Sequence, residues 1–96
     1  GFGGSVKDQI LDIEYLAMRL LDTLRPEYTA ALAERYKLDA DAINETESFE
    51  LLELIARKRG MLISGGEVNT ERAAIMLLDE FRSGAIGRIT LERIPQ

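Results

Sequence analysis

The stretch SFELLELIARKRG, residues 48–60, decides the fold. Six apolar residues crowd it so densely that a helix formed here would lie at the centre of the core. These residues are Phe49, Leu51, Leu52, Leu54, Ile55 and Ala56. Ser48 is a preferred N-terminal cap of a helix, and Gly60 is a preferred residue just past a helix end. The stretch therefore predicts a central helix between Ser48 and Gly60.

Two helices are predicted before the central one. Apolar residues recur every three or four positions from Lys7 to about Leu24, which is typical of an amphipathic helix. They are Ile10, Ile13, Leu16, Ala17, Leu20, Leu21 and Leu24. Pro26 suits the first position of a second helix. The inner stripe of that helix would consist of Tyr28, Ala31, Leu32 and Tyr36. The acidic residues 39–47 predict a loop with up to one helical turn.

A further helix is predicted after the central one. The Ser-Gly-Gly sequence at 64–66 predicts a turn, because two successive glycines relax the backbone. Asn69 or Thr70 would cap a helix that runs to about Ser83 and ends at Gly84. The core stripe of this helix would consist of Ala73, Ala74, Leu77, Leu78 and Phe81.

These segments predict an all-α fold: a small domain of about four helices with a short irregular or extended C-terminal tail. The 96 residues are 46% hydrophobic, which is enough for one modest core. Residues 1–5 read as an artificial linker, so we expect one domain over residues 6–94. Residues 88–94 alternate weakly and would form the tail.

The residue types that most enzymes use are missing or isolated. The chain has no Cys and no His, which removes thiolate metal sites and the commonest general base. No G-x-x-x-x-G-K-[ST] run is present to bind a nucleotide phosphate. Asp79 and Glu80, like other acidic pairs here, are expected on solvated helix surfaces. We therefore expect no enzyme, metal site or cofactor in this chain, and, without an apolar run of about 20 residues, no membrane span.

The charge is distributed unevenly along the chain. The net charge is −5, but residues 49–96 carry seven acids and seven bases, whereas residues 1–48 carry ten acids and five bases. Local charge governs phosphate binding more than the sum over the chain. The bases of the second half are Arg57, Lys58, Arg59, Arg72, Arg82, Arg88 and Arg93.

Two basic elements could face nucleic acid. The first is the run 57–59 at the end of the central helix, next to the glycine turn at 64–66 and to the start of the last helix, where free N–H groups can bind phosphate. The second pairs Arg82 and Gly84 with Gly87 and Arg88. If the last two helices pack antiparallel, these elements lie at opposite poles. The predicted RNA-binding residues are Arg57, Lys58, Arg59, Ser64, Gly65, Gly66, Arg72, Arg82, Gly84, Gly87 and Arg88.

Simpler structural roles exist for both elements. Cations in the last turn of a helix compensate its dipole, and glycines can serve only to connect or end helices. Tyr15, Tyr28 and Tyr36 are spaced like core residues, so we expect recognition of RNA shape and backbone rather than base stacking. Ile75 and Met76 fall partly off the core stripe, and either widen the buried face or contact a partner protein.

Several segments share an order and spacing with a known family. Val6 to Asp12, Leu32 to Leu38, Ile55 to Gly60, and Asp79 to Gly84 are the main ones, supported by Leu62, Gly65 to Val68, Arg72 to Ala74, Gly87 and Arg88. In register over residues 6–92, the chain resembles the C-terminal domain of the ribosome biogenesis GTPase A family. Ala85 departs from the pattern, because the family usually has a lysine there, and Asn69 stands where an aspartate is usual.

The resemblance implies a function for the chain. Members have an N-terminal, circularly permuted GTPase domain and help to mature the large ribosomal subunit, and the helical domain helps to dock them on its rRNA. By resemblance, the bases of this chain face RNA and its glycines shape the backbone. GTP and Mg²⁺ would belong to the GTPase domain, which is absent from this chain, so residues 6–94 would form a non-enzymatic RNA-binding domain.

The resemblance also implies partners and a location. The expected partners are large-subunit rRNA, ribosomal proteins and the protein's own GTPase domain, with the chain itself a monomer. The bacterial cytoplasm is the expected location, with a mitochondrial relative as the alternative. The competing hypothesis is a regulatory module that contacts its own GTPase domain or a ribosomal protein through Ile75, Met76 and the acidic first helix.

Overall fold

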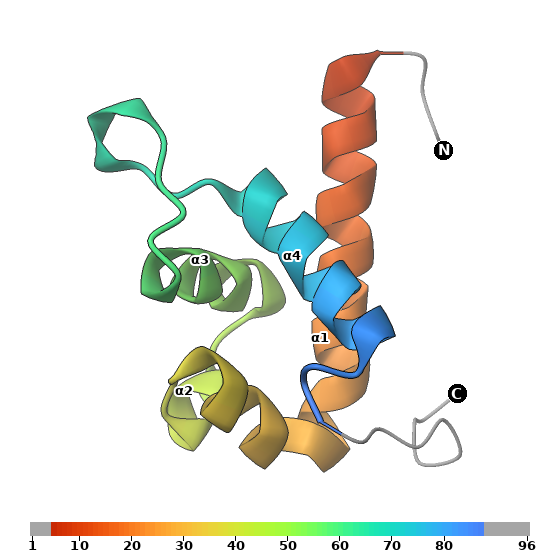
Figure 1. Ribbon diagram of the computed structural model, residues 1–96, viewed down its shortest axis with the longest axis vertical. Coiled ribbons are helices and arrows are strands. Elements are labelled where there is room, and N and C mark those ends of the chain that lie inside the picture. Colours follow the sequence, from red (N-terminus) through yellow and green to blue (C-terminus); the bar gives the residue numbers. More distant parts are fainter. Residues whose placement is uncertain (1–4, 88–96) are drawn as a thin grey trace.

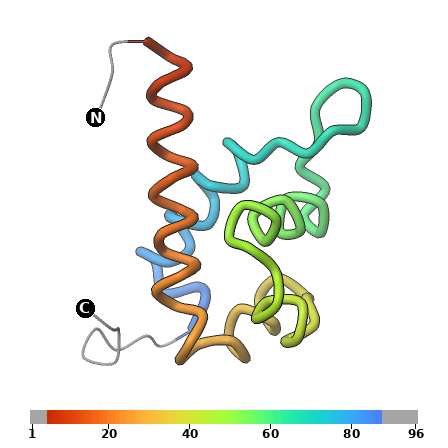
Figure 2. Tube along the Cα trace, turned by 180° about the vertical axis from the view of Figure 1, so that it is seen from behind, coloured from red at the N-terminus to blue at the C-terminus, as the bar shows by residue number. Residues whose placement is uncertain are grey.

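The computed structural model describes residues 5–87, and the predicted all-α fold is confirmed in them. The helices are α1 (Val6–Tyr36), α2 (Ala40–Glu45), α3 (Ser48–Lys58) and α4 (Thr70–Ser83), with a 3₁₀ turn, η1 (Ser64–Gly66). Figure 1 shows α4 crossing the long α1, with α2 and α3 to one side of both; Figure 2 shows the same arrangement from behind. The predicted linker, apart from Ser5, and the predicted tail lie outside the described residues.

The first two predicted helices form one kinked helix. The ribbon of α1 runs through Pro26, and only Tyr28 departs from helical geometry, with φ −125° and ψ 29°. Proline lacks the N–H that would bond four residues back, and its ring crowds that carbonyl, so the helix bends here. The predicted change from a first to a second helical segment is therefore confirmed, but the residue that interrupts the helix is Tyr28, two positions after the predicted start at Pro26.

The acidic segment 39–47 contains α2, in agreement with the predicted helical turn. The predicted cap of α3 was wrong by one residue. Ser48 is the first residue of α3, and Glu47 occupies the cap position without a side-chain cap bond. The Ser48 hydroxyl instead donates a 3.3 Å hydrogen bond to Asp22 Oδ2 of α1. The Ser48 hydroxyl, which the local pattern predicted to cap the backbone of α3, thus bonds to a residue of another helix.

Residues 61–69 form a narrow loop between α3 and α4, which we call the 61–69 loop. An antiparallel bridge joins Leu62 and Val68, and the Ile63 N–H donates to the Glu67 carbonyl oxygen at 2.8 Å. The predicted turn at Ser64–Gly66 is confirmed, with Gly65 at φ +88° and Gly66 at φ +83°. No atom lies within 4 Å of a Cβ built on either glycine, so the positive φ, rather than a close approach, requires glycine here.

The core joins one face of each helix, and most of the predicted core residues belong to it. Its fully buried members include Leu21, Leu24, Leu32, Tyr36, Ile43, Leu51, Leu52, Ile55 and Leu77. Three predicted core residues are exposed instead: Tyr15 by 56%, Leu16 by 46% and Phe49 by 42%. Figure 1 shows the N-terminal turns of α1 extending beyond the other helices, so apolar residues there lack cover.

Candidate RNA-binding surface

The C-terminal turn of α3 presents two cations to solvent. Arg57 and Lys58 are exposed, and within residues 5–87 neither side chain has an ion-pair or hydrogen-bond partner. The helix ends in a Schellman motif. Gly60, at φ +66°, donates to the Arg57 carbonyl at 3.1 Å, and Met61 donates to the Ala56 carbonyl at 2.8 Å. This motif, which Gly60 predicted, holds both side chains at the end of a defined helix.

Acidic side chains surround part of this turn. Arg57 shares a shallow depression with Glu53 of α3 and with Glu67 and Thr70 beyond it. The electrostatic field near Arg57 is therefore mixed.

Arg59, the third member of the basic run, is bound within the protein. Its Nη1 lies 3.1 Å from Glu80 Oε2 and 3.2 Å from the Met76 sulfur. Its Nη2 lies 3.4 Å from Glu80 Oε1, and the guanidinium stands 5.1 Å over the ring centroid of Tyr36. Arg59 therefore ties the end of α3 to α4 and α1, a role that the sequence pattern did not separate from those of its two neighbours.

Glu80 is the centre of this contact. Arg35 at the end of α1 donates from Nε to Oε1 and from Nη2 to Oε2, both at 3.1 Å. The Tyr36 hydroxyl donates to Oε1 at 2.9 Å. The expectation that Glu80 is solvated was wrong, since its side chain is only 15% exposed. Its position seven residues after Ala73 and three after Leu77, on the core stripe, was the available signal.

The ionisation of the cluster follows from these contacts. The hydrogen bonds from Arg35, together with those from Tyr36 and Arg59, lower the pKa of Glu80 to about 2, against the opposing effect of burial. Burial, and then the hydrogen bond to Glu80, raise the pKa of Tyr36. Glu80 is thus a carboxylate and Tyr36 a neutral phenol at neutral pH.

The start of α4 already carries two acceptors. Asn69, one of the predicted caps, accepts a 3.0 Å hydrogen bond from the backbone N–H of Arg72. The Thr70 hydroxyl donates to the carboxylate of Glu14 in α1. The Arg72 side chain is exposed and has no partner within residues 5–87. A phosphate at this helix end would therefore meet a carboxylate from a neighbouring helix.

The second predicted element begins at the end of α4. Arg82 is exposed and pairs with Asp79 at 3.5 Å. Gly84, at φ +80°, ends the helix as predicted, donating to the Phe81 carbonyl at 3.2 Å. Gly87, at φ +130°, would place a Cβ 3.7 Å from the Cβ of Ala31 in α1. Arg88 lies outside the described residues.

The basic run 57–59 does not act as one group. Arg59 of α3 reaches Glu80 in the last turn of α4. Arg57 instead shares a depression with Thr70 at the start of α4, whereas Arg82 lies near the end of that helix.

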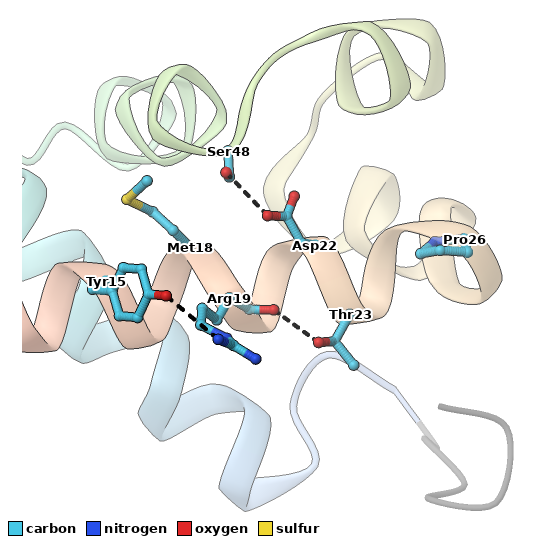
Figure 3. Close-up of a pocket in the computed structure, with 7 residues that line it drawn as sticks. All are labelled: Tyr15, Met18, Arg19, Asp22, Thr23, Pro26 and Ser48. Atoms are coloured by element: carbon cyan, nitrogen blue, oxygen red, sulfur yellow. Dashed lines mark hydrogen bonds between the residues drawn. The ribbon is translucent and has the colours of Figure 1, made fainter. Parts of the chain in front are cut away.

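A shallow polar groove on the other side of α1 offers no catalytic arrangement. In it, Arg19 lies 3.4 Å from the Tyr15 hydroxyl and accepts a 2.8 Å hydrogen bond from Thr23 at its carbonyl (Figure 3). Within residues 5–87, no three acidic side chains cluster as metal ligands would. None of the helices described here is long and apolar enough to cross a membrane.

Comparison with known proteins identifies relatives of the whole domain. Ribosome biogenesis GTPase A of Bacillus cereus is 34% identical over 89 residues, which are 93% of this chain and 29% of that protein. The Priestia megaterium protein of the same name is 35% identical over 89 residues, 93% of this chain and 30% of that protein. This chain is a homologue of part of ribosome biogenesis GTPase A.

A relative that is matched over a shorter segment agrees with this identification. Ribosome biogenesis GTPase A of Thermotoga maritima is 39% identical over 59 residues, 60% of this chain and 22% of that protein. The curated relatives from Bacillus and Priestia match nearly all of this chain, but the chain spans only about 30% of their length. This is consistent with the resemblance to their C-terminal domain. No family model and no solved structure matches the chain.

Some of the segments that carry the resemblance to ribosome biogenesis GTPase A contact one another in the structure. Three of the segments that carry it contribute Arg35 and Tyr36, Arg59, and Glu80, and these side chains meet in one cluster. Spacing that is shared between distant parts of a chain is expected where the residues contact one another in the fold. Arg57 and Lys58, in contrast, make no such internal contact within residues 5–87.

Proposed function

We propose that this domain docks a ribosome-biogenesis GTPase on the rRNA of the large ribosomal subunit. One observation carries the proposal: a homologue of ribosome biogenesis GTPase A exposes Arg57 and Lys58 with no ion-pair partner within residues 5–87. Cations without an internal partner can neutralise RNA phosphates and release their counterions without first breaking an ion pair. The proposed contact is to the RNA backbone, because Tyr28 and Tyr36 are buried, and Tyr15, which is 56% exposed, already has the Arg19 guanidinium 5.8 Å from its ring centroid.

GTP hydrolysis is proposed to belong to the part of the relatives that this chain does not match. The residues present here do not fit GTP and Mg²⁺. The glycine turn Ser64–Gly66 is followed by Glu67, whose charge repels phosphate, rather than by the lysine of a nucleotide-binding loop. We derive no catalytic step for this chain. Its proposed partners are large-subunit rRNA and ribosomal proteins in the bacterial cytoplasm, where it would act as a monomer.

The test is binding of the 96-residue chain to immature large subunits across a salt series. The test variant is Arg57→Ala with Lys58→Ala. The matched control is Lys7→Ala with Arg19→Ala, which removes the same charge from exposed sites on α1. Loss of two phosphate contacts should reduce the slope of log affinity against log salt by about 1.4–1.8, since each contact contributes about 0.7–0.9.

The expected result is salt-dependent, saturable binding that falls in the test variant and persists in the control. Equal losses in both variants would show attraction by overall charge alone and would contradict a defined docking surface. Arg59 is left intact because its removal would break the contact with Glu80 and confuse loss of binding with loss of structure.

A second candidate function is favoured by an apolar groove between α1 and α4. Ile13 and Leu16 of α1 face Ile75, Leu78 and Phe81 of α4 across it, and Ile75 is 49% exposed. Met76, paired with Ile75 in the sequence analysis, lies partly buried against Arg59 instead. We propose the GTPase domain as the occupant, because about 70% of each relative lies beyond the matched part. Addition of purified GTPase domain should shift the NMR signals of Ile75; unchanged signals would contradict this role.

A further inference from the structure

Two guanidinium groups share one carboxylate in the cluster around Glu80. Arg35 lies 3.1 Å from Oε1, and Arg59 lies 3.1 Å from Oε2. The remaining member, Tyr36, is a neutral phenol that donates to Oε1 at 2.9 Å. The four side chains therefore carry two positive charges and one negative charge. One positive charge is left uncompensated at a site where the side chains are held by one another.

The unused hydrogen-bond donors of the cluster belong mainly to Arg35. Arg35 donates hydrogen bonds to Glu80 from Nε and Nη2, and its Nη1 has no partner within residues 5–87. Both terminal nitrogens of Arg59 are engaged, with Glu80, the Met76 sulfur and, at 3.5 Å, the Arg35 carbonyl oxygen. A guanidinium has five N–H groups in a planar fork, so Arg35 keeps an outer edge that can donate to an anion.

The outer edge of Arg35 is accessible and fixed. The Arg35 side chain is 38% exposed, whereas that of Glu80, which holds it from the inner side, is 15% exposed. The bidentate contact removes most of the rotational freedom that a free arginine would lose on binding a ligand. The Arg59 guanidinium, stacked 5.1 Å over the Tyr36 ring centroid, adds positive charge, while both of its terminal nitrogens are engaged within the protein.

We propose that the outer edge of Arg35 is a phosphate-binding site for the backbone of RNA. Arg59 supplies the surplus positive charge, and Glu80 acts as a positioning residue for both arginines. This site deepens the proposed docking function and rests on it. It extends the docking surface from the end of α3 to the end of α1, through a residue that charge clustering in the sequence did not select.

The test compares two variants that break the same ion pair and change the charge in opposite directions. Arg35→Ala removes the outer donors and one positive charge. Glu80→Gln keeps both arginines and removes the negative charge. Both lose the contact between Arg35 and the Glu80 carboxylate, and Glu80→Gln also loses the ion pair with Arg59 and alters the hydrogen bond from Tyr36, so urea unfolding is measured for both variants.

Binding of each variant to purified immature large subunits is measured over a salt series. Arg35→Ala should bind more weakly, with a log–log salt slope lower by about 0.7–0.9, as expected for one lost phosphate contact. Glu80→Gln should keep the salt slope of the unchanged chain, because Arg35 is still present to contact the phosphate, although it is held less rigidly. Equal weakening in both variants would show that only the structural contact matters, and an unchanged slope in Arg35→Ala would show that no phosphate lies there; either result overturns the site.

The Arg57→Ala, Lys58→Ala variant separates this site from the docking function. If that variant loses binding while Arg35→Ala keeps it, the docking function stands and the Arg35 site is overturned. If the unchanged chain does not bind even at low salt, the docking function itself is overturned, and the Arg35 site with it.

Discussion

Arg25 of α1 donates a 3.0 Å hydrogen bond from Nη1 to the carbonyl oxygen of Ile43 in α2. The same nitrogen contacts the carbonyl oxygen of Thr46, just past the end of that helix. Nη2 forms an ion pair with Asp22 at 2.9 Å, and the Arg25 side chain is only 15% exposed. A helix of six residues, such as α2, is unstable alone. The last carbonyl groups of a helix have no partner within it, and Arg25 donates hydrogen bonds to carbonyl groups at this end of α2.

We therefore predict that Arg25→Met lowers the free energy of unfolding by about 1–3 kcal/mol, because buried carbonyl groups would lose a charged donor. Urea unfolding followed by circular dichroism measures the change. Arg19→Met is the matched control: Arg19 is exposed, so its replacement should leave the free energy of unfolding nearly unchanged. Similar values for both variants would contradict the role assigned to Arg25.

The second prediction concerns acid stability. The pKa of Glu80 is lowered from 4.5 to about 2, so its carboxylate stabilises the fold fully above pH 4.5 and progressively less as the pH falls towards 2. The Glu80→Gln variant lacks this titration, while the other acids are the same in both chains. The stability difference between the two chains in urea should therefore shrink over this range. A difference that is independent of pH would exclude Glu80 as the titrating group.

The third prediction follows from the end of α1. Lys37 has φ +58°, a left-handed conformation that disfavours residues with a side chain. Its N–H and that of Leu38 both donate to the Ala33 carbonyl, so this conformation ends the helix. We predict that Lys37→Gly raises the free energy of unfolding by about 1 kcal/mol. Glu34→Gly, at an exposed helical position, should lower it by about 1 kcal/mol; a loss in both variants would contradict the prediction.

The fourth prediction tests Arg82 and depends on the docking function. Asp79 lies 3.5 Å from Arg82, and both side chains are about three-quarters exposed. Asp79→Asn should tighten binding to large subunits by at most about fivefold, since an exposed ion pair contributes about 0.2–1 kcal/mol. Asp41→Asn on α2 changes the net charge equally and is the control. Equal tightening by both substitutions would indicate overall charge rather than release of Arg82.

Local interactions explain what could be predicted from the chain alone. Gly60 and Gly84 end α3 and α4, and Asn69 begins α4, through bonds to residues within five positions. Such bonds depend on residue type and spacing, so pattern is enough to find them.

Other features depend on which parts of the chain meet. Ser48 was predicted to cap α3 but bonds to Asp22, and the apolar Leu16 and Phe49 are exposed. Periodicity shows which face of a helix is apolar but not how much of its length another helix covers. The sequence pattern also placed the start of the second helical segment at Pro26, whereas the residue that leaves helical geometry is Tyr28.

By itself, the sequence determined that this protein is a small all-α domain, where its last two helices end, and to which proteins it is related. Only the tertiary structure decided that Arg57, Lys58 and Arg59 are not equivalent. Arg59 lies within 3.1 Å of Glu80, a residue 21 positions away. Charge patterning records how many cations a segment carries, but a carboxylate brought close by folding decides which of them remain available to a ligand.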